Sequence, residues 1–409
     1  VIRGAYGIFY ASIGVLYTNT QQPGFTRSTP ITPSSDNGLT FTALLDDPLP
    51  DGLLPVIGAG GGLTTTLNQG VTFFAKDRKR PYAQRWTFGI QRELPGAHVL
   101  EVAYVGNRGT RLGVSRNINA TPGQYFSTHP VRWEDDVRYL AEAFPNPFYG
   151  LHPQFTSSTI SRQNLLRPYP HFGDVAFSDP VGYSWYHSLQ NRLEKRFSRG
   201  YTLQVAYTWS KTMQATQFLN AFDPMPYEEL SDLDRPHRLT GSGIWELPFG
   251  RGRAIGSNWH PVLNAIGGGW QLGGVYQFQS GNPLAWGNIS FFGNPDDVKL
   301  PRSERSVDRW FNPEPFNRVS SLQPASNVRT MPFRFSDLRA DTQRRWDFSL
   351  SKSFTIREGV TLRFRADTFN AFNQVVLKDP DRNPTSGSFG RITGQEPPRS
   401  WQLGLRLLF

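Results

Sequence analysis

The sequence contains no cysteine, no long apolar run and no block of basic residues. Without cysteine the chain can form neither a disulfide framework nor a thiolate metal site. Its mean hydropathy is −0.46, and no stretch approaches the roughly 18 apolar residues that a membrane-spanning helix requires. Membrane strands are not excluded, because their apolar side chains occupy only every second position. The net charge of +10 comes from scattered residues, so we expect no nucleic-acid partner.

Aromatic residues and turn formers are abundant in the 409 residues. There are 30 phenylalanines, 15 tyrosines and 11 tryptophans, so aromatics make up 14% of the chain. Glycine (39) and proline (32) are also frequent. Aromatic residues favour strands, whereas glycine and proline favour turns. This composition predicts an all-β chain with many strands joined by turns.

About ten segments alternate apolar with polar residues, as the wall of an antiparallel transmembrane β-barrel requires. In the clearest of them, Tyr201 to Lys211, Tyr, Leu, Val, Tyr and Trp alternate with Thr, Gln, Ala, Thr and Ser. We therefore predict strands at Val1–Tyr10, Arg80–Leu94, Ala97–Leu112, Gly182–Phe197, Tyr201–Lys211, Pro236–Leu247, Gly268–Ser280, Thr342–Phe354, Val360–Phe372 and Arg399–Phe409.

The connections between these segments alternate between long and short. Short turns are expected at 95–96, 198–200 and 355–359, and long polar loops at 11–79, 113–181, 212–235 and 282–341. This alternation places all short turns at one end of the sheet and all long loops at the other. We expect short periplasmic turns and long extracellular loops, a regularity that a soluble sandwich has no reason to keep.

The last strand is amphipathic and ends on an aromatic residue. Its apolar face carries Trp401, Leu403, Leu405, Leu407 and Phe409, and its other face carries Gln402, Gly404 and Arg406. This ending resembles the final strand of bacterial outer-membrane barrels, whose terminal aromatic is part of the signal read by the barrel assembly machinery. The partner of this strand is either Val1–Tyr10 or a strand before residue 1.

Four further motifs strengthen the resemblance and narrow it to a family. Glu101–Leu112 (EVAYVGNRGTRL), Lys195–Gly200 (KRFSRG), Glu246–Gly250 (ELPFG) and Asp367–Asn373 (DTFNAFN) resemble the barrel of TonB-dependent outer-membrane receptors. The Oar-like receptors, which carry a carboxypeptidase-regulatory-like domain, resemble the chain most. The resemblance implies a barrel of about 22 strands, an internal plug and uptake energised by the TonB complex. It also implies contact with outer-membrane lipid and lipopolysaccharide, and location in the bacterial outer membrane.

The chain supplies only about ten of those strands. Residues 1–409 are expected to be the C-terminal part of the barrel, with no plug domain and no signal peptide among them. The TonB complex would then act through a plug that these residues lack. A shortened relative without gated transport and a barrel closed by ten strands alone are the alternatives.

Six charged residues share the polar phase of the last three predicted strands, and we take them as lumen-lining candidates: Arg345, Asp347, Arg363, Arg365, Asp367 and Arg406. They can hold a plug, steer an anionic substrate by their field, or satisfy one another as cross-strand ion pairs. We favour the cross-strand interpretation.

No catalytic, cofactor or metal-binding residue is predicted. The acidic residues Glu228, Glu229, Asp232 and Asp234 admit a calcium site, but a solvated loop is the preferred interpretation. Loop aromatics such as Trp310 and Phe311 can bind a ligand or pack the loops together, and we favour packing. Two rival functions stay open: a passive structural or adhesive barrel, and an outer-membrane enzyme for which Asp234 and His237 are the only nearby pair.

Overall fold

The computed structural model describes residues 1–12, 24–34 and 36–409, and it is dominated by one antiparallel sheet. Residues 13–23 and 35 of the predicted loop 11–79 lie outside the described residues. Ten strands follow one another across the sheet in chain order: β1 (Ile2–Tyr10), β3 (Tyr82–Leu94), β4 (His98–Asn117), β7 (Val175–Ser198), β8 (Tyr201–Ala215), β10 (His237–Glu246), β11 (Trp270–Gln279), β14 (Gln343–Arg357), β15 (Val360–Phe369) and β16 (Ser400–Leu408). These ten strands confirm the ten predicted from alternation.

Two of the predicted strand ends are wrong. β4 and β7 stay paired well into the predicted loop 113–181, as far as Asn117 and Ala176. The ladder changes register twice between Thr110 and Val114, which leaves Pro180 outside the paired residues. Proline has no amide to donate to a ladder, so a bulge is where a long strand can accept it. The strand therefore continues past a residue that normally predicts its end.

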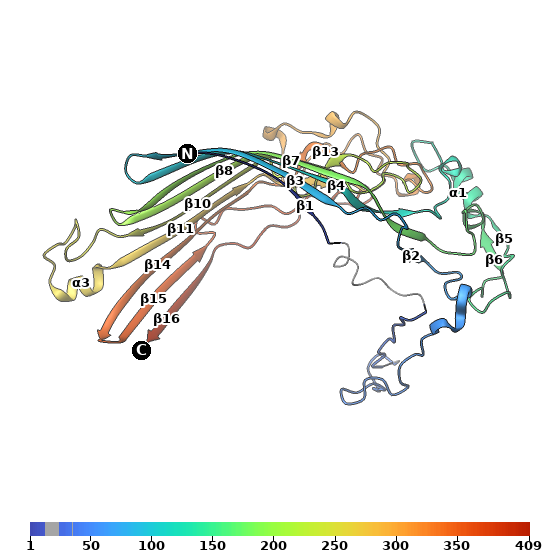
Figure 1. Ribbon diagram of the computed structural model, residues 1–409, viewed down its shortest axis with the longest axis horizontal. Coiled ribbons are helices and arrows are strands. Elements are labelled where there is room, and N and C mark those ends of the chain that lie inside the picture. The colour runs from blue at the N-terminus through green and yellow to red at the C-terminus, as the bar shows by residue number, and fades with distance from the viewer. Residues whose placement is uncertain (13–23, 35) are drawn as a thin grey trace.

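Short turns gather at one end of the strands. The turn between β7 and β8 consists of Arg199 and Gly200, whose φ values of 53° and 82° are both positive, as a type I′ hairpin turn requires. A longer connection between β10 and β11 contains α3 (Pro261–Gly267), which begins at a proline, a residue whose fixed φ suits the first helical position. Both chain ends and α3 lie at this turn end in Figure 1.

Long loops occupy the opposite end. They contain the helices α1 (Glu134–Ala141) and α2 (Arg162–Leu165), and the short strands β5 (Ala143–Pro145), β6 (Thr159–Ser161), β12 (Pro283–Ala285) and β13 (Arg334–Arg339). Two further short strands, β2 (Val71–Phe73) and β9 (Glu229–Leu230), add to β7 and β8 at the loop end of the sheet. Five short 3-10 helices also lie in the described part of these connections: Gly58–Thr64, Gly123–Tyr125, Pro295–Val298, Arg302–Glu304 and Ser320–Leu322. No helix in the described ranges is both long and apolar enough to cross a membrane.

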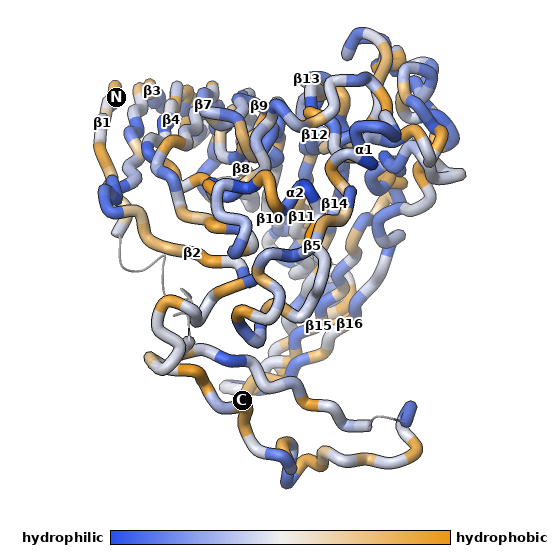
Figure 2. The backbone as a smooth tube through the Cα atoms, turned by 90° about the vertical axis from the view of Figure 1, so that its right-hand side faces the viewer, coloured by the Kyte–Doolittle hydropathy of each residue, from blue (hydrophilic) through white to orange (hydrophobic). Residues whose placement is uncertain are grey.

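The sheet has one apolar face and one polar face. Cross-strand register aligns a single row of apolar residues across six strands: Leu403, Ala366, Leu350, Leu272, Trp245 and Tyr201. The row is open to the surroundings, since Leu403 is 70% and Trp245 45% exposed. Apolar positions recur along the strands in Figure 2. A continuous exposed apolar wall is unfavourable in water and suited to lipid.

The sheet is open. β1 pairs with β3 and β16 pairs with β15, and neither edge strand has a second partner among the described strands. The two edges lie far apart in both views (Figures 1 and 2). The pairing of the last strand with Val1–Tyr10, and closure by ten strands alone, are therefore not found.

The largest buried core of the described residues lies in the loops, not under the sheet. Its members come from the segments 280–342 and 370–399: Leu284, Trp286, Val298, Trp310, Phe311, Phe316, Met331, Phe335, Leu338, Phe389 and Ile392. Trp286 stacks on Phe316 with ring centroids 4.9 Å apart. These loops are packed structures rather than solvated connections.

Candidate lumen face and loop cap

The polar face of β14, β15 and β16 carries all six lumen-lining candidates. Arg363 lies directly opposite Arg406, and Asp367 lies opposite Gln402 on one side and Ser349 on the other. Arg345, Asp347 and Arg365 occupy the same alternate positions on their strands, so they share this face. Register shows that the six residues share one face of these three strands, and their lining of a lumen stays a prediction.

The ion pairs on this face run along the strands, so the expected cross-strand pairing is wrong. Arg345 Nε lies 2.8 Å from Asp347 Oδ1, and Arg365 Nε lies 2.9 Å from Asp367. The physical reason is that the residues opposite Arg365 are Ser351 and Gly404, neither of which carries a charge. The nearest carboxylate on the same face is therefore two positions along the same strand.

Arg363 and Arg406 stand apart from these pairs. Both are exposed, they face each other across β15 and β16, and neither meets a carboxylate among the described residues. Among the described residues, the Arg363 guanidinium donates a hydrogen bond to Ser353 Oγ, at 3.4 Å. Like charges placed directly opposite each other are destabilising, so this pair favours an anion between or beside them.

A polar groove lies next to this arginine pair. Its volume is about 530 Å³, and its lining includes Glu246, Gln271, Ser351, Arg363 and Arg365. The groove is at the turn end of the polar face, since Glu246 ends β10 and Gln271 begins β11. Arginine guanidinium groups with a few hydrogen-bonding side chains suit carboxylate or phosphate groups.

At the loop end, two buried ion pairs join β9 and its flanking loop to β13. Arg334 Nη1 donates to Glu229 Oε2 at 2.6 Å, and Arg339 Nη2 donates to Asp234 Oδ2 at 2.5 Å. Both carboxylate side chains are only 1% exposed. The prediction of a solvated acidic loop is therefore wrong for these two residues. No group of three or more potential metal ligands occurs in the part of the chain that the structure describes.

Further contacts join the long loops into one unit, which we call the loop cap: residues 118–174, 216–236, 280–342 and 370–399. Asn327 Nδ2 donates to the carbonyls of His129 and Val131, each at 2.9 Å. Arg391 pairs with Asp308 at 2.6 Å and so joins the last two loops. The packing interpretation of the loop aromatics is confirmed for Trp310 and Phe311, which are 8% and 0% exposed.

The sequence patterns did not predict that two lysines of the sheet are buried. Lys195 and Lys352 occupy apolar-phase positions near the turn end, yet they are only 2% and 5% exposed. Lys195 Nζ donates to the carbonyl of Ser198 at 2.9 Å, and Lys352 Nζ donates to the carbonyl of Ile266 at 3.1 Å. Each ammonium therefore binds carbonyl groups that end a turn or helix. The break in apolar alternation at Lys352 was the only signal in the sequence.

The proposed enzyme pair is not formed. Asp234 accepts hydrogen bonds from Arg339 and from the Thr212 amide, whereas His237 Nδ1 lies 2.9 Å from the Tyr207 hydroxyl. Each member already has another partner, so the arrangement lacks the base–orienter contact that a hydrolytic site requires.

An amphipathic meander with one lipid-suited face, short turns at one end and packed loops at the other defines a transmembrane β-barrel wall. A family model described as "Outer membrane beta barrel domain" matches residues 1–402. The chain belongs to this family, and its place is the bacterial outer membrane. No curated protein matches the sequence.

Solved structures with a similar fold include two outer-membrane proteins. One is the outer membrane transporter YddB from Escherichia coli, with 12% identity, a TM-score of 0.43, and coverage of 84% of this chain and 34% of that chain. Another is the ferripyoverdine receptor of the outer membrane of Pseudomonas aeruginosa, with 10% identity, a TM-score of 0.33, and coverage of 80% and 27%. The chain thus spans about a third or less of the length of the structures it matches.

Proposed function

We propose that the chain forms part of the wall of a TonB-dependent outer-membrane receptor that takes up a large or scarce substrate. The observation that supports this best is the open ten-strand sheet, whose edge strands β1 and β16 do not meet. A curved sheet of this kind is what a sector of a wider barrel looks like, and barrels of about 22 strands enclose a lumen that is plugged in transporters. The receptor motifs in the sequence point to the same class.

In this proposal each region has a role. The apolar face contacts outer-membrane lipid and, at the loop end, lipopolysaccharide, while β16 and Phe409 are read by the barrel assembly machinery. The loop cap receives the substrate, because loops held on a rigid scaffold commonly carry binding residues. A plug outside residues 1–409 occupies the lumen beside Arg363 and Arg406, and the TonB complex acts through it. The protein has no catalytic role and no cofactor.

The test compares three strains of the native bacterium: wild type, one lacking this gene and one lacking TonB. Uptake of labelled metal chelates, cobalamins and oligosaccharides is measured at nanomolar concentration. The proposal expects at least one compound whose high-affinity uptake is lost in both deletion strains. Loss in the gene deletion alone, together with steady conductance of the purified protein in planar bilayers, would instead identify a passive barrel.

A further inference from the structure

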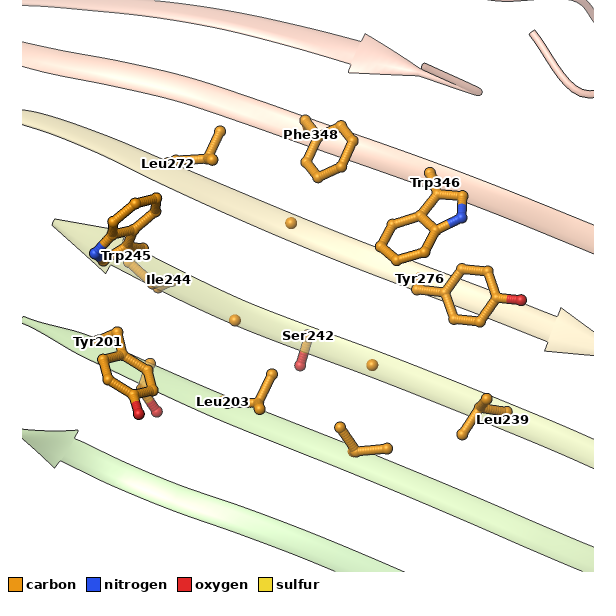
Figure 3. A pocket seen from close by; sticks show the side chains of 15 residues that line it. Tyr201, Leu203, Leu239, Ser242, Ile244, Trp245, Leu272, Tyr276, Trp346 and Phe348 are labelled. Carbon is orange, nitrogen blue, oxygen red and sulfur yellow. The ribbon is translucent and has the colours of Figure 1, made fainter. Parts of the chain in front are cut away.

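A groove of about 630 Å³ crosses the apolar face of β8, β10, β11 and β14. Figure 3 shows Trp245 and Tyr201 near one end of it, and Tyr276 and Trp346 near the other. Cross-strand register places these residues on the face that carries the apolar row, not on the face of the charged candidates. The groove therefore opens towards the hydrocarbon of the membrane. We call it the lipid-face groove.

Glycine creates the floor of the lipid-face groove. Gly243 of β10 lies directly opposite Gly274 of β11, and Gly241 follows two positions along the same face. Large residues surround this bare backbone, including Leu203 and Phe348. Glycine weakens a strand interior, since it adds entropy to the unfolded chain and offers no side chain to pack. Three such residues in one patch leave a recess where the neighbouring wall presents aliphatic and aromatic groups.

The recess has the shape of a hydrocarbon chain. Along β10 it extends from Trp245 to Leu239, six residue steps, or about 20 Å at roughly 3.4 Å per residue. That length is comparable to an extended long acyl chain. The aromatic side chains of Tyr201 and Trp245 at its turn end suit the membrane interface on that side, because tryptophan and tyrosine are enriched there.

Positive charge lies at the turn end of the groove. Tyr201 lines the groove and directly follows the turn that contains Arg199, and Arg196 lies on the other side of this turn. Both arginines are exposed, and their guanidinium groups have no carboxylate partner among the described residues. Nearby cations are already engaged: Arg253 pairs with Glu246 at 2.9 Å, and Lys195 binds turn carbonyls. An anionic group at this end would give the two arginine guanidinium groups a counter-charge.

From these observations we propose that the lipid-face groove binds one phospholipid of the periplasmic leaflet. One acyl chain lies over the glycine floor, and the phosphate lies beside Arg199. The short turns are periplasmic, so the headgroup side of the groove faces the leaflet that holds phospholipid. A second copy of the chain and lipopolysaccharide are the competing occupants that the experiment must distinguish.

The experiment fills the groove without disturbing the backbone. A Cβ at Gly241 meets nothing closer than Tyr276 Cβ at 3.8 Å, so Gly241→Leu is accommodated and places a side chain in the recess. Gly4 offers a matched control on the same face of β1, with its nearest neighbour also at 3.8 Å. Wild type, Gly241→Leu and Gly4→Leu are extracted from outer membranes in mild detergent and examined by native mass spectrometry. Heat-modifiable migration in gels checks that each variant is folded.

We expect wild type and Gly4→Leu to retain one phospholipid, and Gly241→Leu to lose it by at least tenfold in occupancy. Arg199→Asn keeps a residue that tolerates the positive φ of 53° but removes the charge, so it should lower the share of anionic phospholipid retained. Equal retention by Gly241→Leu and wild type would overturn the proposal. So would a bound lipopolysaccharide, or a lipid-free dimer that Gly241→Leu dissociates.

Discussion

Among single residues, we expect substitution of the buried carboxylates of the loop cap to reduce its stability most. Glu229→Gln preserves the size of the side chain but leaves Arg334 without its counter-charge, and the Arg334 side chain is only 12% exposed. Removing one partner of a buried pair costs about 3–5 kcal/mol. Local opening of residues 216–236 and 334–339 should therefore become at least about 100-fold more frequent, which hydrogen exchange of their amides measures.

Glu228→Gln is the matched control for this change. Glu228 is the preceding residue, is exposed, and accepts a hydrogen bond from the Tyr183 hydroxyl at 2.8 Å. An exposed interaction of this kind contributes no more than about 1 kcal/mol. If Glu229→Gln and Glu228→Gln gave equal exchange rates, the ion pair with Arg334 would not be holding the loops.

The stability of the loop cap should depend on pH through the ion pair between Lys299 and Asp337. The hydrogen bond from Lys299 holds the pKa of Asp337 below its ordinary value of 3.8 and raises the pKa of Lys299 above 10.5. The contribution of the Asp337 carboxylate to folding stability is present above the ordinary aspartate pKa. It is lost as pH falls through the lowered pKa. The ammonium contribution is present below the ordinary lysine pKa and is lost as pH rises through the raised one.

Asp337→Asn should therefore destabilise the loop cap at pH 7 and destabilise it less at pH 3, which lies below the ordinary aspartate pKa of 3.8. Because the Asp337 side chain is 67% exposed, the difference at pH 7 should be at most about 1 kcal/mol and should shrink in high salt. Thermal melting of wild type and variant at the two pH values measures it. An equal difference at both would show that the carboxylate charge is not responsible.

Sequence patterns predicted the faces of individual residues well and their partners poorly. Alternation assigned Arg363 and Arg406 to one face, because a strand repeats every two residues. It did not reveal that Glu229 meets Arg334, since these residues are 105 positions apart and meet only when the loops fold together. For the same reason the burial of Lys195 was not predicted: its partners are carbonyls of a turn whose geometry a pattern does not describe.

At the scale of elements, β16 allows the lipid-facing assignment to be tested directly. Leu403→Arg places a charge on the apolar face, and Gln402→Arg places the same charge on the polar face one residue away. A basic residue facing lipid near the membrane centre costs about 2–4 kcal/mol, and a lumen-facing one does not. Folding equilibria in phospholipid vesicles should therefore shift for Leu403→Arg only. An equal cost for Gln402→Arg would mean that both faces of β16 contact lipid.

Most elements were predictable because alternation and turn chemistry agree along the wall. The predicted ends of β4 and β7 were wrong, because the two strands stay paired as far as Asn117 and Ala176. A bulge accommodates Pro180, a residue type that normally predicts the end of a strand. Cross-strand ion pairs were predicted for β14 to β16, yet register placed uncharged residues opposite Arg365. Register depends on neighbouring strands, so the sequence of one strand does not contain it.

For the whole molecule, the main question that the open sheet raises is whether its polar face contacts water. The sequence contains no cysteine, so a single introduced cysteine can be labelled without competing thiols. Leu362 and Arg363 are adjacent on β15 and point to opposite faces. In the folded protein in vesicles, Arg363→Cys should react with a small water-soluble maleimide, whereas Leu362→Cys should react only after unfolding. The reverse pattern would mean that the lipid and water faces have been exchanged.

The Arg363→Cys variant can also be used to measure how wide the space beside this position is. Maleimides carrying polyethylene glycol chains of increasing size should label Arg363→Cys up to a limit set by the lumen. A barrel closed by about ten strands has an interior filled by side chains, whereas one of about 22 strands admits large reagents unless a plug occupies it. We expect large reagents to label residues 1–409 expressed alone, because the proposed receptor places its plug outside these residues. Exclusion of all but the smallest reagent would indicate a narrow barrel and contradict the proposed receptor wall.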